Sequence, residues 1–115
     1  MSPTLVFDRD GRFVAAAGSP GGNLIVGFVS EVLVAMLDWK MDPQKAAGLP
    51  HIVNLNGETR IEKGTALEGL TGALEARGHT VRASPLASGT QAILARDGRL
   101  WGGADPRREG VAIGD

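Results

Sequence analysis

The segment between Asn23 and Asp38 constrains the fold more than any other feature of the sequence. Its apolar residues recur at helical spacing, and they are Leu24, Ile25, Phe28, Val29, Val32, Leu33, Met36 and Leu37, with Val26 and Val34 widening the face. Because Ser30 and Glu31 are the only strongly polar side chains in its interior, water can reach only a narrow strip of this helix. We therefore expect a buried helix over residues 23–38 that neighbouring layers must cover.

Two pairs of strand-like segments, one towards each end of the sequence, are available to cover that helix. Residues 4–7 and 12–16 read as short strands around Gly11, because glycine accepts the positive φ that a hairpin turn needs. Residues 91–95 and 99–101 read as a second hairpin around Asp97 and Gly98. We expect the two hairpins to pair in one sheet.

A short helix and a strand are predicted next along the chain. Asp42 followed by Pro43 is typical of a helix start, and this helix should end before Gly48. His51 opens an extended segment, and residues 59–62 alternate polar and apolar as a half-exposed strand does.

A second amphipathic helix is predicted after that strand. Residues 65–68 fit a capping box, and Gly78 stands where a left-handed residue would end the helix. Its expected buried stripe is Leu67, Leu70 and Leu74. With a strand at 79–83, the predicted order is ββααβαβββ. A length of 115 residues allows one core and not two, so we expect a single domain over residues 1–115.

Charge and composition exclude several classes of partner. Twelve basic residues stand against thirteen acidic ones with no block of like charge, so we expect no nucleic-acid partner. The sequence has no cysteine, and its two histidines, His51 and His79, lack a partner at ligand spacing, so we expect no metal and no cofactor. The longest apolar stretch falls short of the roughly 20 residues of a membrane span.

The glycine-rich segment at residues 18–22 is the feature least explained by folding alone. It stands directly before the long helix, and the first N–H groups of a helix can bind an anion or an oxyanion. The simpler interpretation is a tight strand-to-helix turn. A nucleotide phosphate loop is disfavoured, since no lysine occurs before Lys40.

Other polar residues are expected to be structural. His51 could be a general base, but a structural histidine with satisfied hydrogen bonds is the preferred interpretation. His79 is interpreted as a polar cap. The hydroxyls of Ser88 and Thr90 are expected to bond their own turn. Residues 105–108 are expected to form a solvated turn whose ion pair contributes little.

The ordered series of motifs resembles the γ-glutamyltransferase (γ-glutamyltranspeptidase) family, in the C-terminal part of its small subunit. The resemblance covers essentially the whole chain, and each motif is weak alone while the series is specific. The matching segments are Ser2-Pro3-Thr4, Gly18-Ser19-Pro20-Gly21-Gly22, residues 41–46, Leu49-Pro50-His51, residues 61–64, 77–81, 91–93 and 103–108.

That resemblance implies an α+β fold, part of the four-layer αββα sandwich of N-terminal-nucleophile hydrolases. It implies an enzyme that cuts its own precursor and uses the exposed threonine to attack γ-glutamyl amides such as glutathione. Gly21 and Gly22 match the oxyanion turn and are the expected catalytic residues. The implied partners are the large subunit and the upstream part of the small subunit, and the implied compartment is periplasmic or secreted.

Departures from the family pattern limit what this chain is expected to do. Thr4 lies within the first strand and is not the nucleophile, which the family places upstream, as it does a serine pair that holds the substrate carboxylate. Residues 88–90 read Ser-Gly-Thr where the family has Gly-Ser-Thr, so they receive no site role. We expect the chain alone to be inactive and, with its sheet incomplete, to self-associate.

Two other functions remain open from the sequence. A related acylase that acts on cephalosporin side chains would share the fold and the glycine turn. A stand-alone binding or scaffold domain would never be joined by a threonine nucleophile.

Overall fold

The computed structural model describes residues 1–114 and is composed of two compact units. One unit comprises Met1–Leu49 with the segment from Ser88 onward, and the other is Pro50–Ala87. The elements of the first unit are β1 (Thr4–Phe7), β2 (Phe13–Gly18), the 3₁₀ turn η1 (Gly22–Leu24), α1 (Ile25–Leu37), α2 (Pro43–Ala47), β6 (Gln91–Arg96) and β7 (Arg99–Ala104). The single domain expected from length stays a prediction.

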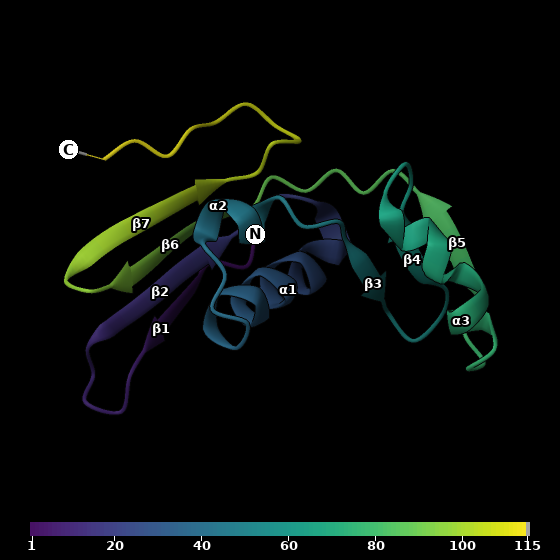
Figure 1. Ribbon diagram of the computed structural model, residues 1–115, viewed down its shortest axis with the longest axis horizontal. Coiled ribbons are helices and arrows are strands. Elements are labelled where there is room, and N and C mark those ends of the chain that lie inside the picture. Colours follow the sequence, from purple (N-terminus) through teal and green to yellow (C-terminus); the bar gives the residue numbers. More distant parts are fainter. Residues whose placement is uncertain (115) are drawn as a thin grey trace. The chain divides into compact units, whose positions relative to one another are not determined.

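A four-stranded antiparallel sheet with the order β1-β2-β6-β7 forms one layer of the first unit (Figure 1). In its register Ala16 of β2 stands opposite Leu5 of β1 and Ile93 of β6. The turn between β6 and β7 has positive φ at both Asp97 and Gly98, as a two-residue hairpin requires. The two hairpins therefore pair through β2 and β6 in one sheet, which confirms the expectation from sequence.

Helix α1 packs against one face of this sheet and supplies much of the core. Val29, Val32 and Met36 of α1 are buried in one cluster with small residues of the sheet, among them Ala15 and Ala92. The buried helix predicted from periodicity is confirmed. The exposed strip is wider than expected, because Val26 and Val34 are 62% and 40% exposed on the side of α1 that bears Ser30.

Helix α2 packs closely against β7. The carboxylate of Asp42 accepts hydrogen bonds from the Gln44 and Lys45 N–H groups, so the predicted cap is confirmed. The amide side chain of Gln44 donates to the Ala104 carbonyl at 2.8 Å and accepts from the Ala104 N–H at 3.1 Å. Gln44 thus satisfies backbone groups of β7 that a neighbouring strand would otherwise bond.

The second unit contains a three-stranded sheet with the order β3-β4-β5. Its elements are β3 (Ile52–Asn54), β4 (Thr59–Glu62), the 3₁₀ turn η2 (Ala66–Leu70), α3 (Thr71–Glu75) and β5 (Val81–Ser84). Strand β3 pairs antiparallel with β4, and β4 pairs parallel with β5. The order in the chain is therefore ββααββαβββ, and the predicted order lacked β3, which is only three residues long.

The stripe predicted for the helix that follows β4 is wrong. None of Leu67, Leu70 and Leu74 is buried, and Leu70 is 47% exposed. The segment is divided into η2 and α3, whose different periods prevent residues spaced for one α-helix from sharing one face. Its ends follow the prediction, since Thr65 caps it and Gly78 has a φ of +89°.

Candidate active site

The glycine turn connects the end of β2 to η1, which runs directly into α1. Gly21 has a φ of +137° and Gly22 a φ of +66°, both in the region that favours glycine. A Cβ on Gly21 would also lie 3.0 Å from the Phe28 ring, whereas a Cβ on Gly22 would meet nothing within 4 Å. Gly21 is therefore required by both backbone conformation and packing, and Gly22 by conformation alone.

The first turn of this helix has no side-chain cap. Gly21 occupies the cap position and has no side chain that could accept from the N–H groups of η1. Such groups can donate to an anion or to the negative oxygen of a tetrahedral intermediate. The local geometry is compatible with the oxyanion role expected for Gly21 and Gly22.

The loop Ser88–Thr90, which received no site role from sequence, packs against this turn. The Gly89 N–H donates to the Ser19 Oγ at 3.4 Å. A Cβ on Gly89 would lie 2.8 Å from the Pro20 Cγ, so only glycine allows the two segments to approach so closely. The glycine turn is thus supported by a loop that is distant in sequence and adjacent in space.

Asp105 holds that loop in place and is completely buried. It accepts hydrogen bonds from the Ser88 hydroxyl and, at 3.1 Å, from the Thr90 N–H. The expectation that Ser88 would bond its own turn is therefore wrong. A buried carboxylate with free acceptor sites offers a stronger partner than a local carbonyl.

Arg107 compensates the buried charge of Asp105. The two side chains form an ion pair at 3.0 Å, with the arginine 16% and the aspartate 0% exposed. Arg107 also donates to the carbonyls of Ala47 and Leu49, at 3.4 and 2.7 Å. The solvated turn expected here is wrong, because these side chains connect β7, the loop at Ser88 and the end of α2.

The hydrogen bonds of Asp105 make its ionisation a source of stability. Burial acts to raise the pKa of this carboxyl, but hydrogen bonds from Ser88, Arg107 and the Thr90 N–H outweigh it and hold the pKa below its ordinary value. Since the folded-state pKa is lowered, the stabilisation is present above the unfolded-state pKa of about 3.9 and is lost as pH falls through the folded-state pKa.

We therefore expect the stability difference between the wild-type chain and Asp105→Asn to shrink as pH is lowered from 7 to 3. Urea unfolding of both chains across this range measures the difference directly. Comparison with the variant cancels the titration of the other carboxylates. A difference that stays constant down to pH 3 would contradict a lowered pKa for Asp105.

Both histidines lie in the second unit and have local partners. His51 is buried, and its backbone N–H donates to the Glu62 carboxylate at 2.9 Å. His79 Nδ1 lies 2.8 Å from the Thr59 hydroxyl. Within residues 1–114 no three His, Cys, Asp or Glu side chains are grouped to hold a metal ion. No helix in the same range is long and apolar enough to cross a membrane.

Comparison with known proteins places this mixed helix-and-sheet fold in one family. The model of the gamma-glutamyltranspeptidase family matches residues 1–115, and the chain belongs to this family. The glutathione hydrolase proenzyme of Escherichia coli K12 is 37% identical over 93% of the chain. The Acylase ACY 1 proenzyme of Pseudomonas sp. SE83 is 33% identical over 98% of it. The chain spans about a fifth of the length of these relatives.

Solved structures agree with the sequence comparisons. The gamma-glutamyltranspeptidase of Pseudomonas nitroreducens in complex with L-DON superposes with a TM-score of 0.85 and 26% identity, covering all of this chain and 62% of that one. A Helicobacter pylori gamma-glutamyltranspeptidase mutant gives a TM-score of 0.82 over 94% of this chain and 61% of that one, at 29% identity. The resemblance recognised from the sequence motifs is confirmed.

Proposed function

We propose that this chain is part of a γ-glutamyltransferase or glutathione hydrolase, in which it supplies the oxyanion turn of the active site. The observation that carries this proposal is the geometry of Gly21 and Gly22. Both residues have positive φ values and lie at the N-terminal end of the helical segment formed by η1 and α1. Membership of the family and its proenzyme relatives support it. In this proposal the nucleophilic threonine and the large subunit are contributed by residues outside these 115.

The proposed reaction is transfer of a γ-glutamyl group through a covalent intermediate. The α-amine of the threonine takes the proton of its own hydroxyl, whose oxygen attacks the γ-carbonyl carbon of glutathione or a related amide. The carbonyl oxygen becomes negative and accepts hydrogen bonds from the glycine turn. One such donor is worth about 3 kcal/mol of transition-state stabilisation. The amine leaves with a proton, and water or an acceptor amine then takes the acyl group.

Release of p-nitroaniline from γ-glutamyl-p-nitroanilide tests this proposal. We expect activity from a processed enzyme that carries this chain together with the upstream threonine segment and the large subunit. We expect none from the 115 residues alone, which have no N-terminal threonine. Activity of the 115 residues alone would contradict the assignment of the nucleophile. Absence of p-nitroaniline release by the processed enzyme would contradict the γ-glutamyl assignment.

An acylase is the second candidate, because the Acylase ACY 1 proenzyme is 33% identical to the chain. The two functions differ in the donor, which is a γ-glutamyl amide in one and the side-chain amide of an acylated cephalosporin in the other. Hydrolysis of the cephalosporin side-chain amide without release of p-nitroaniline would favour the acylase.

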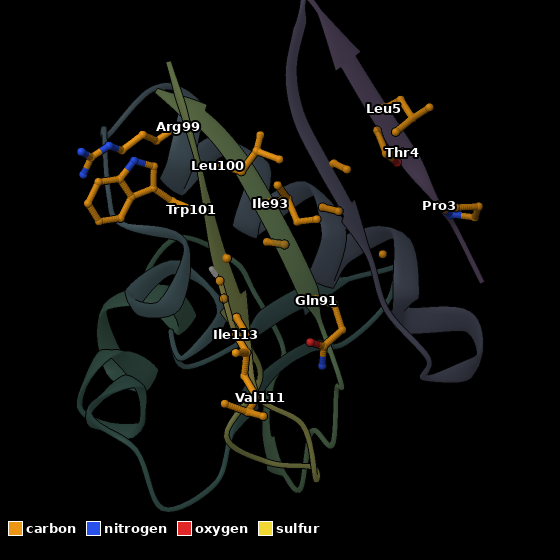
Figure 2. Close-up of a pocket in the computed structure, with 18 residues that line it drawn as sticks. Pro3, Thr4, Leu5, Gln91, Ile93, Arg99, Leu100, Trp101, Val111 and Ile113 are labelled. Atoms are coloured by element: carbon orange, nitrogen blue, oxygen red, sulfur yellow. The ribbon is translucent and has the colours of Figure 1, made fainter. Parts of the chain in front are cut away.

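The face of the four-stranded sheet opposite α1 bears exposed apolar side chains, and the C-terminal segment contacts it at Gly102, where a Cβ would lie 2.7 Å from the Ala112 Cβ. We call this surface the open face, and its residues include Leu5, Ala16, Ile93 and Leu100. Leu5 is 65% exposed, Ile93 is 42% exposed and Leu100 is 70% exposed. Figure 2 shows Ile93 and Leu100 extending from β6 and β7, with Val111 and Ile113 of the C-terminal segment beside β7. In the proposed enzyme, the rest of the αββα sandwich covers this face.

Without that cover, we expect copies of the chain to associate through the open face. Leu100→Lys places a charge at its most exposed leucine and is expected to shift the chain towards monomer in sedimentation velocity. Leu55→Lys is the matched control, since Leu55 is 51% exposed and lies in the other unit. A monomeric wild-type chain at all concentrations, or an equal effect of both variants, would contradict this prediction.

A further inference from the structure

Ser19 lies at the junction between the glycine turn and the loop that supports it. Its side chain is buried, with only 3% of the residue exposed. The Ser19 hydroxyl donates a hydrogen bond to the Pro20 carbonyl at 2.7 Å and accepts one from the Gly89 N–H at 3.4 Å. A buried hydroxyl therefore bonds the backbone on both sides, and one of its partners is the peptide that leads into Gly21.

The bond to the Pro20 carbonyl also determines where the Gly21 N–H points. These two groups belong to the same peptide unit, which is planar and trans, so they project in opposite directions. Fixing the carbonyl oxygen on one side fixes the N–H on the other. The Ser19 hydroxyl can in this way orient the Gly21 N–H without contacting the substrate itself.

The turn needs such a restraint because glycine does not supply one. Gly21 and Gly22 have no Cβ to limit rotation, so the peptide between Pro20 and Gly21 can reorient at little steric cost. Reorientation would turn the Gly21 N–H away from an oxyanion. Preorganised donors stabilise a transition state because no energy is spent in aligning them during the reaction.

We propose that Ser19 is a positioning residue that orients the Gly21 N–H as an oxyanion donor. This inference rests on the proposed function of the glycine turn. The supporting contacts continue from Ser19 to the loop Ser88–Thr90, where Gly89 packs against Pro20 and Asp105 anchors Ser88 and Thr90. Arg108 closes the same loop through a 2.9 Å bond from its Nε to the Ser88 carbonyl.

Kinetics of the processed enzyme provide the first test. Ser19→Ala is expected to lower kcat for γ-glutamyl-p-nitroanilide by about 10-fold to 100-fold with little change in KM, because the donor is misdirected and not removed. Ser19→Thr retains the hydroxyl and is expected to recover most of kcat. Ser30→Ala, at an exposed serine of α1, is the control and should change neither constant. Wild-type kcat in Ser19→Ala, or a rise in KM alone, would overturn the proposal.

Carbon-13 and amide NMR of the full chain provide a second test that does not require activity. Loss of the hydroxyl donor in Ser19→Ala is expected to move the Pro20 carbonyl resonance upfield and to shift the amide resonance of Gly21, which belongs to the same peptide unit. The Gly89 amide also bonds to Ser19 Oγ, so its resonance should shift as well. Unchanged Pro20 and Gly21 resonances would overturn the positioning role.

The two tests separate this inference from the function on which it rests. An inactive wild-type enzyme with a displaced Pro20 resonance in Ser19→Ala would reject the γ-glutamyl reaction and support the orienting contact. An active wild-type enzyme that is unaffected by Ser19→Ala would support the reaction and reject the role of Ser19.

Discussion

Replacement of Arg107 by methionine is expected to destabilise the chain by about 3–5 kcal/mol. The variant leaves Asp105 buried with its charge uncompensated, because Arg107 is its ion-pair partner at 3.0 Å. It also removes the donors to the Ala47 and Leu49 carbonyls. Methionine retains much of the apolar stem of arginine. The loss of stability therefore reports mainly the lost charge and hydrogen bonds, and only to a small extent lost packing. Urea unfolding at pH 7 measures it.

Two variants show whether the buried charge is the cause. The double variant Asp105→Asn/Arg107→Met removes both charges and is expected to be more stable than Arg107→Met alone. Arg12→Met is the control, since Arg12 forms ion pairs with Asp8 and Asp10 at a side-chain exposure of 74% and should change stability by less than about 0.5 kcal/mol. Equal losses in Arg107→Met and Arg12→Met would contradict a structural role for the buried pair.

Replacement of Gly103 by alanine is expected to cost about 3 kcal/mol or more and to separate α2 from β7. A Cβ on Gly103 would lie 2.3 Å from both the carbonyl carbon and the carbonyl oxygen of Pro43, and 2.6 Å from the Gln44 nitrogen. These are backbone atoms, so no side-chain rotation relieves the overlap. The bonds between Gln44 and Ala104 depend on this close approach and should be lost with it.

Gly72→Ala is the matched control for this prediction. Gly72 lies in α3, and a Cβ there would meet nothing within 4 Å. Because alanine has the higher helix propensity, we expect Gly72→Ala to be neutral or stabilising. Urea unfolding gives both values, and the amide resonances of Ala104 and Gln44 report the separation. A Gly103→Ala chain as stable as Gly72→Ala would show that α2 does not dock as described.

The elements predicted correctly from the sequence are those whose signals are local. The hairpin turns at Gly11 and Asp97-Gly98, the periodicity of α1 and the cap at Asp42 each depend on a few adjacent residues. Strand β3 was missed because three residues carry too little periodicity to be distinguished from an extended segment. The stripe at Leu67 was wrong because the segment adopts two helix types in succession.

The candidate site was predictable only in part. The turn at Gly21 and Gly22 was found because glycine pairs before an apolar helix are visible in sequence. The network of Asp105 and Arg107 was not found, since a charged turn is solvated by default and its burial depends on contacts with residues that are remote in the chain. Gly103 would have carried a signal if the predicted strand at 99–101 had been extended to Ala104, because glycine inside a strand often marks close backbone approach.

The pairing of β2 with β6 has a consequence for how the protein forms during synthesis. Ala16 bonds in register with Ile93, so the sheet of the first unit cannot be completed until β6 and β7 have left the ribosome. The unit Pro50–Ala87 is continuous in sequence, so all of its residues are available before then. Closing a sheet across so long a loop is slow, because the chain entropy is lost before the distant contacts form. The nascent protein therefore carries β1, β2 and α1 without the other half of their sheet until β6 and β7 have been synthesised.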